Sequence, residues 1–308
     1  CVERCHYHCN LSALCPYRSF LRRTRTAGYD FQIVNHNLVL ADILSQKGGR
    51  SRLLPPSGLM VFDEAHKLLD AARKMYGMVF CSTELEQVAA SVCRAAVSST
   101  DKKEILHLRG EMLRLNTLLF ETLKQEAGAK YDKTSQAVRF TPAVTRILRA
   151  LAVVLGRLSS CFQTAKRYTL LASRIDQKQE KLMVLLEHAQ SICWLEHTGV
   201  TSCQVCALPK ELDYLLYEDI WNSDIPCVLT SATLSIGGDF SHFMHQTGID
   251  LLEQNRLLMT SKASPFDYEN HALLYLPDCM PFPDTKNSVY MTAVLKQLTE
   301  LIRQIGRA

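Results

Sequence analysis

The feature that most constrains the fold is a long stretch of helical periodicity in the middle of the chain, from about residue 83 to residue 190. Apolar side chains recur there at spacings of three and four, which places them along one face of each helix. One face contains Ile105, Leu108, Met112, Leu115, Leu119 and Leu123, and the next contains Ile147, Leu151, Val154, Leu158, Cys161, Ala165 and Tyr168. With a third helix predicted over residues 175–192, the block is expected to form a helical hairpin or bundle.

Apolar runs of strand length lie on both sides of this helical block. Residues 59–62 precede it, and residues 204–208 and 226–230 follow it. The run at 59–62 is unbroken, which is typical of a strand buried in a parallel sheet. Because strands flank the helices, the block is predicted to be an insertion into an α/β sheet domain rather than a separate domain in tandem.

A further unit is predicted to begin near Ser264. It is expected to contain a strand over residues 272–276, a proline-rich loop and a helix over residues 289–304. The most apolar run of the chain, residues 147–158, is interrupted by two arginines and is too short to cross a bilayer. No membrane segment is therefore expected. Because the chain has no initiator methionine and opens on a cysteine motif, it is expected to be a fragment.

Twelve of the 308 residues are cysteines. This is far below the roughly 8–10% of a small disulfide scaffold, so reduced thiols or metal ligands are favoured. Four of them, Cys1, Cys5, Cys9 and Cys15, have the spacing C-x3-C-x3-C-x5-C. Four thiolates so close in sequence can surround an iron–sulfur cluster or Zn²⁺, and the spacing alone does not separate the two.

The other cysteines are predicted to be structural. Cys203 and Cys206 form a C-x2-C pair, but no second pair lies nearby and their neighbours are strand-like, so they are predicted to be sheet residues. The remaining cysteines are expected to act as small core hydrophobes. These are Cys81, Cys93, Cys161, Cys193, Cys227 and Cys279.

The net charge of +4 comes entirely from the first 25 residues, which contain five arginines and one glutamate. Four of the arginines follow the cysteine cluster directly, together with Tyr17 and Phe20, and they are Arg18, Arg22, Arg23 and Arg25. Arginines beside aromatic side chains supply phosphate contacts and stacking surfaces for single-stranded nucleic acid. A solvated basic helix face is the alternative that charge alone allows.

Three polar residues follow the apolar run at 59–62, namely Asp63, Glu64 and His66. Carboxylates at the carboxyl end of a parallel strand lie where α/β folds bind ligands. One carboxylate can hold Mg²⁺ on nucleotide phosphates while the other orients or deprotonates a water molecule. His66 can contact phosphate or a neighbouring segment. The alternative is a helix start at which Asp63 and Glu64 only complement the helix dipole.

Four segments, taken in order, resemble the DinG branch of the XPD/DinG superfamily 2 helicases. Residues 59–66 resemble motif II with its DEAH box, and residues 229–235, reading LTSATLS, resemble motif III. Residues 30–42, reading DFQIVNHNLVLAD, resemble the stretch before the DEAH strand. Residues 264–277, reading SPFDYENHALLYLP, resemble the beginning of the second motor domain.

The resemblance implies an α/β fold of RecA-like P-loop NTPase motor domains. Its expected divisions are an iron–sulfur segment (1–27), motor domain 1 in two parts (28–82 and 191–262), an inserted helical arch (83–190) and the start of motor domain 2 (263–308). It also favours a [4Fe–4S] cluster. Cys5, Cys9 and Cys15 match the family's clustered three ligands, and the family usually has one ligand well upstream, so Cys1 is either the fourth ligand or a spare.

For the catalytic residues, the resemblance implies that Asp63 holds Mg²⁺, that Glu64 is the catalytic base for ATP hydrolysis, and that Ser231 and Thr233 couple hydrolysis to strand separation. The expected partners are single-stranded and forked duplex DNA, and the expected state is a monomer in the bacterial cytoplasm. The chain contains no P-loop, since residues 48–51 lack the lysine and the spacing. It is therefore not expected to hydrolyse ATP efficiently alone. A related nuclease or motor without unwinding activity and a zinc-bearing nucleic-acid-binding module are the alternatives.

Overall fold

The computed structural model describes residues 14–26, 28–96, 101–127, 135–163, 166–197, 202–262, 264–283 and 287–306. The chain forms two compact units, which divide between Leu258 and Met259. Both contain helices, and the first also contains a parallel and an antiparallel sheet, which is consistent with the predicted α/β class. Within the described residues, no helix is long and apolar enough to cross a membrane.

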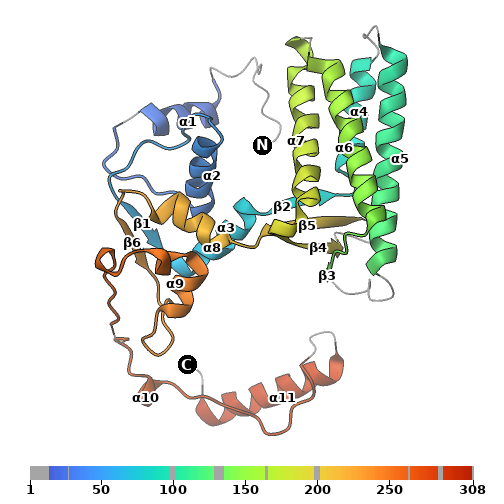
Figure 1. Ribbon diagram of the computed structural model, residues 1–308. Helices are drawn as coiled ribbons and strands as arrows, with labels where there is room; N and C mark the ends of the chain where they lie inside the picture. The colour runs from blue at the N-terminus through green and yellow to red at the C-terminus, as the bar shows by residue number, and fades with distance from the viewer. Residues whose placement is uncertain are drawn as a thin grey trace. The chain divides into compact units, whose positions relative to one another are not determined.

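Most elements lie in the first unit (Figure 1). Its α-helices are α1 (Pro16–Thr26), α2 (His36–Lys47), α3 (Leu68–Tyr76), α4 (Glu84–Ala96), α5 (Lys102–Ala127), α6 (Pro142–Gln163), α7 (Thr169–Leu186), α8 (Leu212–Leu216) and α9 (Ser241–Thr247). Its strands are β1 (Met60–Asp63), β2 (Met78–Cys81), β3 (Ser135–Ala137), β4 (Ser191–His197), β5 (Cys203–Pro209) and β6 (Cys227–Thr230). Its short helical turns are η2 (Ala65–Lys67), η4 (Lys166–Tyr168), η5 (His188–Gln190), η7 (Ile249–Leu251) and η8 (Gln254–Arg256), together with the π-helical turn η6 (Tyr217–Trp221).

Strands β1 and β6 pair in parallel although the whole helical block separates them in the sequence. The two strands on either side of the helical block therefore belong to one sheet. Phe62 of β1 is buried in a core with α2, α3 and Trp221. Val61, on the other face of the strand, is 60% exposed, so the strand that was predicted to be buried in a parallel sheet is buried on one face only. The described elements cover only the face of this sheet to which Phe62 belongs.

The helical block forms a second hydrophobic core. Helices α4, α5, α6 and α7 pack in sequence as neighbours, and α7 also contacts α4 (Figure 1). The apolar stripes predicted on α5 and α6 are largely buried there. Thr141 precedes α6 as predicted, and its Oγ1 accepts a hydrogen bond from the amide of Val144 (3.4 Å).

The core of the helical block also includes an antiparallel sheet in the order β2-β5-β4-β3. The predicted third helix therefore ends at Leu186, and residues 191–197 form β4 instead. In β4 the side chains of Cys193 and Leu195 are buried, while that of Trp194 between them is only partly buried. Burial therefore alternates from residue to residue, as it does in a strand. Phe80 and Ala207 also belong to this core, so the antiparallel sheet and the helices share one packed interior.

A partly buried ion cluster ties the sheet to the bundle. The carboxylate of Glu84 accepts hydrogen bonds from Lys178, from Lys181 (2.8 Å) and from the backbone amide of Cys81 (3.0 Å). Burial alone raises the pKa of Glu84, but these hydrogen bonds outweigh that effect and hold the pKa below its ordinary value of 4.5. The ionised carboxylate therefore stabilises the attachment of α7 to β2 and α4.

Replacing Glu84 with glutamine is expected to lower the stability of the helical block at pH 7 by about 2 kcal/mol, because two lysines lose a charged acceptor. A carboxyl whose pKa is depressed by folding contributes stability above its unfolded pKa, and this is lost as the pH falls through the folded pKa. The difference from wild type should thus shrink below about pH 4.5. The free energy of unfolding is measured at each pH by urea unfolding, which is followed by Trp194 fluorescence in a Trp221→Phe background.

The exposed pair Glu104–Arg157 supplies a matched control for that measurement. Its atoms are 2.9 Å apart, and both side chains are more than half exposed. Glu104→Gln should therefore cost only about 0–1 kcal/mol at pH 7. Equal losses for Glu84→Gln and Glu104→Gln would contradict a special role for the Glu84 cluster.

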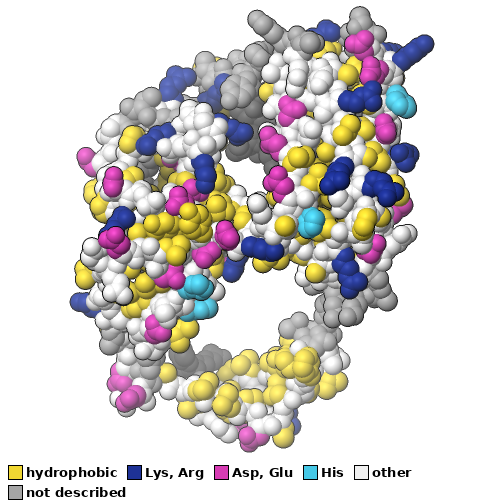
Figure 2. Space-filling model, viewed as in Figure 1, with side chains coloured by type: hydrophobic (Ala, Val, Ile, Leu, Met, Phe, Trp, Pro, Cys, Tyr) yellow, Lys and Arg dark blue, Asp and Glu magenta, His cyan; other side chains and the backbone are white. Residues whose placement is uncertain are grey.

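The described residues of the second unit form the helices α10 (Tyr268–His271) and α11 (Ser288–Ile305). The long helix confirms the prediction for residues 289–304. The strand predicted over residues 272–276 was wrong, because no described segment hydrogen-bonds to this stretch as a strand, and Leu274 is 82% exposed. Figure 2 shows hydrophobic side chains gathered on the surface of this unit, and Leu295, Leu298 and Ile302 of α11 are among those that are exposed.

Candidate functional site

The candidate site lies where the parallel strands β1 and β6 end. Asp63 is paired in register with Thr230, so the residues that follow the two strands come out at the same edge of the sheet. Asp63 is the last residue of β1, Glu64 and His66 follow it, and Ser231 and Thr233 follow β6. The predicted motif residues therefore lie together, although the helical block separates them in the sequence.

The turn after β1 has an unusual backbone conformation. Glu64 has φ 49° and ψ 46°, and it is the one non-glycine residue with positive φ in the described ranges. A left-handed conformation costs a residue with a Cβ about 1–2 kcal/mol, so other interactions must hold the turn. The amide of Glu64 donates a hydrogen bond to Oδ1 of Asp63 (3.0 Å), and the amide of Lys67 donates one to the carbonyl of Glu64 (2.8 Å).

His66 joins the two strand ends. Its Nδ1 lies 2.8 Å from Oγ of Ser231 and 3.2 Å from Oε2 of Glu64. The sequence allowed His66 to contact either phosphate or a neighbouring segment, and in the structure it contacts the segment that follows β6. Because a carboxylate only accepts hydrogen bonds, the contact with Glu64 favours a form with a proton on Nδ1. The amide of Thr233 lies 3.4 Å from the same serine oxygen, while the Thr233 side chain is exposed.

His36 also reaches the site, although no sequence pattern pointed to it. It is the first residue of α2, and its Nε2 lies 3.0 Å from the carbonyl oxygen of Asp63, 27 residues further along the chain. The side chain of Asn35 caps the same helix by accepting from the amide of Leu38 (2.9 Å). The residues NHN had only suggested a helix start, and nothing in their spacing from the DEAH box pointed to this contact.

Buried aromatic rings support the site from the core side. Phe62 lies between the rings of His36 and Trp221, with ring centroids 5.9 and 5.8 Å away, and the indole of Trp221 donates to the carbonyl of Thr247 (2.7 Å). Trp221 ends the π-helical turn η6, an element that is frequent at functional sites. The floor of the site is therefore a packed and hydrogen-bonded cluster.

Asp219 of η6 connects three elements below the site. Its carboxylate accepts hydrogen bonds from Lys47 at the end of α2 (2.8 Å) and from the hydroxyl of Tyr76 at the end of α3 (2.7 Å). Burial is the main cause that raises the pKa of Tyr76, and the neighbouring carboxylate adds to it. Tyr76 therefore remains a neutral donor at physiological pH, and it anchors α3 to η6.

The predicted cluster ligands Cys1, Cys5 and Cys9 lie outside the described residues. Cys15 lies just before α1 as a partly exposed free thiol. Helix α1 contains the four predicted arginines, and Tyr17 and Phe20 on it are exposed. The side chain of Arg25 is outside the described set. Among the described residues, no group of three or more histidine, cysteine or acidic side chains could hold a metal ion.

The structural role predicted for the other cysteines holds in part. Cys203 and Cys206 are buried in β5, as predicted, and burial raises the pKa of Cys206 to about 12, with a further contribution from Glu196. Burial also raises the pKa of Cys227 in β6 to about 11, so both remain thiols at neutral pH. Cys93 and Cys279 are exposed, so for them the prediction of core residues was wrong.

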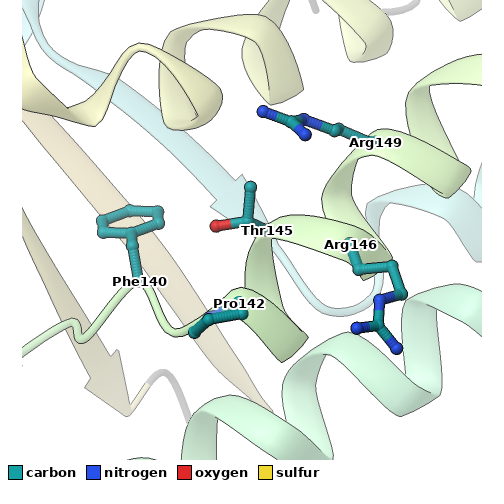
Figure 3. A pocket seen from close by; sticks show the side chains of 5 residues that line it. All are labelled: Phe140, Pro142, Thr145, Arg146 and Arg149. Atoms are coloured by element: carbon teal, nitrogen blue, oxygen red, sulfur yellow. The ribbon is translucent and has the colours of Figure 1, made fainter.

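A shallow cavity of about 450 Å³ lies on the helical block (Figure 3). It is lined by Phe140, Pro142, Thr145, Arg146 and Arg149. Figure 3 shows the two arginine side chains pointing in different directions from α6, so they do not converge on one point. Phe140 stacks on His188 with ring centroids 4.0 Å apart. None of the motif residues lines this cavity, and we assign it no chemistry.

Comparison with known proteins found related sequences but no matching family model. The chain is 26% identical over 294 residues to the ATP-dependent DNA helicase YoaA of Escherichia coli, which covers 93% of the chain and 44% of that protein. It is 25% identical over 257 residues to the probable ATP-dependent helicase YpvA of Bacillus subtilis (80% of the chain, 38% of YpvA). It is 24% identical over 316 residues to the ATP-dependent DNA helicase DinG of Photobacterium profundum (89% and 44%).

The fold and the site define an α/β protein in which residues 63–66 and 231–233 meet at one edge of the parallel sheet. The sequences of the related proteins make this class of protein more specific. The chain is a relative of the DinG-type helicases, as its four sequence segments predicted, and it spans less than half the length of the curated relatives that it matches.

Proposed function

We propose that the chain is part of an ATP-dependent DNA helicase, in which Mg-ATP hydrolysis drives movement along single-stranded DNA and the unwinding of duplexes during repair or replication. The observation that carries the proposal is the contact between His66 and Ser231, 2.8 Å apart, which joins the DEAH turn to motif III. The names of the relatives, which describe ATP-dependent DNA helicases, support it. The proposed divisions are those that the resemblance implies, with RecA-like motor parts at 28–82 and 191–262, an arch at 83–190 and a second motor domain from 263.

The carboxylates at the turn fit the oxygen ligands that Mg²⁺ prefers. Oδ1 of Asp63 accepts the amide of Glu64, and Oδ2 has no hydrogen-bond partner among the described residues. Asp63 would hold Mg²⁺, which neutralises charge on the ATP phosphates when bound. Glu64 would orient the attacking water and accept its proton.

His66 and Ser231 would couple hydrolysis to movement. In this hydrogen bond, His66 lies two residues beyond Glu64 and Ser231 lies one residue beyond the end of β6. A displacement of the DEAH turn on ATP binding or product release would therefore move Ser231 and the backbone up to Thr233. The segment after β6 would pass this displacement on to the strand-binding surface.

Unwinding of a forked DNA duplex by the full-length protein tests the proposal. ATP-dependent strand separation is expected for the wild type and should be absent from Glu64→Gln under the same conditions. Ser231→Ala and Thr233→Ala should reduce unwinding more than ATP hydrolysis, because they disturb coupling rather than chemistry. ATP hydrolysis without strand separation by the wild type would instead favour a motor without unwinding activity or a nuclease.

A [4Fe–4S] cluster held by Cys1, Cys5, Cys9 and Cys15 is proposed from the resemblance. Cys15 is a partly exposed thiol immediately before α1, which is compatible with a ligand. Iron, sulfide and zinc analysis of the full-length protein, with its visible spectrum, separates a cluster from a zinc site. Zinc without iron would favour the nucleic-acid-binding module.

Helix α1 is proposed to contact single-stranded DNA at its entry. Reversing two charges with Arg22→Glu and Arg23→Glu should lower single-strand affinity on the order of tenfold at 0.1 M salt, because phosphate contacts are lost. The slope of log affinity against log salt concentration should become shallower by about 1 to 2. Fluorescence anisotropy with a labelled oligonucleotide measures both quantities.

Arg146→Glu with Arg149→Glu is the matched control for helix α1. These arginines are exposed on α6 and have no ion-pair partner among the described residues. An equal loss of affinity in this pair would show that α1 is not a specific contact. Unchanged affinity and salt dependence in the Arg22/Arg23 variant would also contradict the proposal. A monomer in the bacterial cytoplasm remains a prediction.

A further inference from the structure

The single peptide group between Asp63 and Glu64 is held at both of its ends. Its N–H is bound by Oδ1 of Asp63 at 3.0 Å, and its C=O lies 3.0 Å from Nε2 of His36. This is the peptide that turns the chain from β1 into the left-handed conformation of Glu64. Its orientation therefore decides where the two carboxylates point relative to each other.

We propose that His36 is a positioning residue for the catalytic turn. It donates from Nε2 to the Asp63 carbonyl and so keeps Glu64 in the left-handed conformation that separates the Asp63 and Glu64 carboxylates. The inference rests on the proposed function, because it assigns a role in ATP hydrolysis to a residue that touches neither nucleotide nor water in the proposed chemistry.

The surroundings of His36 suit a rigid support. Its ring packs at 49° against Phe62, which is buried, and Asn35 caps the helix that begins at His36. A carbonyl oxygen accepts only, so Nε2 must carry the proton. A histidine with its ring position set by the core and its proton directed at the turn can transmit the position of α2 to Glu64.

The hydrogen bond to the Asp63 carbonyl distinguishes this role from simple packing. His66 and Ser231 approach the turn through side chains, whereas His36 acts on the backbone before Glu64. Without it, the Asp63–Glu64 peptide is free to rotate and Glu64 can leave the left-handed region that its Cβ disfavours. Both carboxylates would then lose their places relative to bound Mg-ATP, since a shift of about 1 Å in a reacting group can cost roughly a hundredfold in rate.

The test compares three variants of the full-length protein by steady-state ATP hydrolysis with single-stranded DNA. His36→Phe keeps a ring against Phe62 but removes the donor, and it is expected to lower kcat roughly tenfold to a hundredfold with KM for ATP nearly unchanged. His36→Gln places an amide Nε2–H at a similar reach and should restore most of kcat. Asn35→Ala weakens the start of α2 without removing the donor, so it should lower the melting temperature and reduce kcat less than His36→Phe does.

A purely structural role would produce a different pattern. In that case kcat would follow the melting temperature, and the phenylalanine and glutamine variants would behave alike. Equal kcat in these two variants, or wild-type kcat in His36→Phe, overturns the proposal. The concentration of Mg²⁺ at half-maximal rate should also rise in His36→Phe, because the Asp63 carboxylate is displaced with the turn.

A crystallographic measurement separates failure of this inference from failure of the proposed function. If the wild-type protein hydrolyses no ATP, the proposed function is wrong. The positioning role of His36 is then tested by crystal structures of the wild type and of His36→Phe. A negative φ at Glu64 in the variant, with a positive φ in the wild type, supports the positioning role of His36. A left-handed Glu64 in both structures overturns it.

Discussion

Replacing Glu64 with glutamine in the full-length protein is expected to lower kcat for ATP hydrolysis by roughly 10²- to 10⁴-fold, the usual contribution of a general base. The amide keeps the size of the side chain and its position in the left-handed turn, but it cannot accept a proton from water. Affinity for Mg-ATP should change by less than about threefold, because Asp63 and not Glu64 is proposed to hold the metal ion. Steady-state hydrolysis and titration with a fluorescent ATP analogue measure the two effects.

The same change at Glu86 controls for loss of a negative charge. Glu86 is exposed on α4 and lies outside the strand-end site. Glu86→Gln should hydrolyse ATP at the wild-type rate and melt at the same temperature. A Glu64→Gln protein that retains more than about a tenth of the wild-type kcat would rule out Glu64 as the base and leave its role to another group.

Replacing Phe62 with alanine is expected to destabilise the core beneath the site by about 3–5 kcal/mol, because it removes a buried ring and leaves a cavity. Phe62 is 2% exposed and contacts the rings of both His36 and Trp221. Its loss should raise amide exchange in β1, β6 and α3 while exchange in α5 and α6 stays unchanged. Hydrogen exchange read peptide by peptide measures these local free energies.

Phe80→Ala is the matched control for that experiment. Phe80 is fully buried in the core of the helical block, where it stacks on Phe120 with ring centroids 5.8 Å apart. Exchange should then rise in α4, α5 and β5 and stay unchanged in β1 and β6. If either variant raised exchange equally in both regions, the two cores would be one cooperative unit, contrary to their separate packing.

The helices were largely predictable because their signal is local. Leu108, Leu115 and Leu151 recur with the helical period, and they are buried in the structure as that period requires. Strand β4 was missed because its alternation covers only seven residues and follows directly on a helix. The strand predicted at 272–276 failed for a related reason, since an apolar run becomes a strand only where another strand is available to bond to it.

The candidate site was predictable in its residue types but not in all of its contacts. The residues DEAH after an apolar run, and Ser231 after a second run, identified both strand ends. His36 gave no such signal, because its role depends on a backbone carbonyl, which every residue has. The left-handed conformation of Glu64 was also invisible, since a glutamate in the sequence does not favour positive φ.

By itself, the sequence determined which side chains are available at the strand ends and which helix faces are apolar, because both follow from residue identity and short-range period. Only the tertiary structure decided that His66 meets Ser231, 165 residues away, and that His36 contacts the carbonyl of Asp63, 27 residues away. Contacts at such separations depend on the parallel pairing of β1 with β6 and on the packing of α2 against their shared core. The pairing and the packing belong to the folded chain as a whole, and no short stretch of residues encodes them.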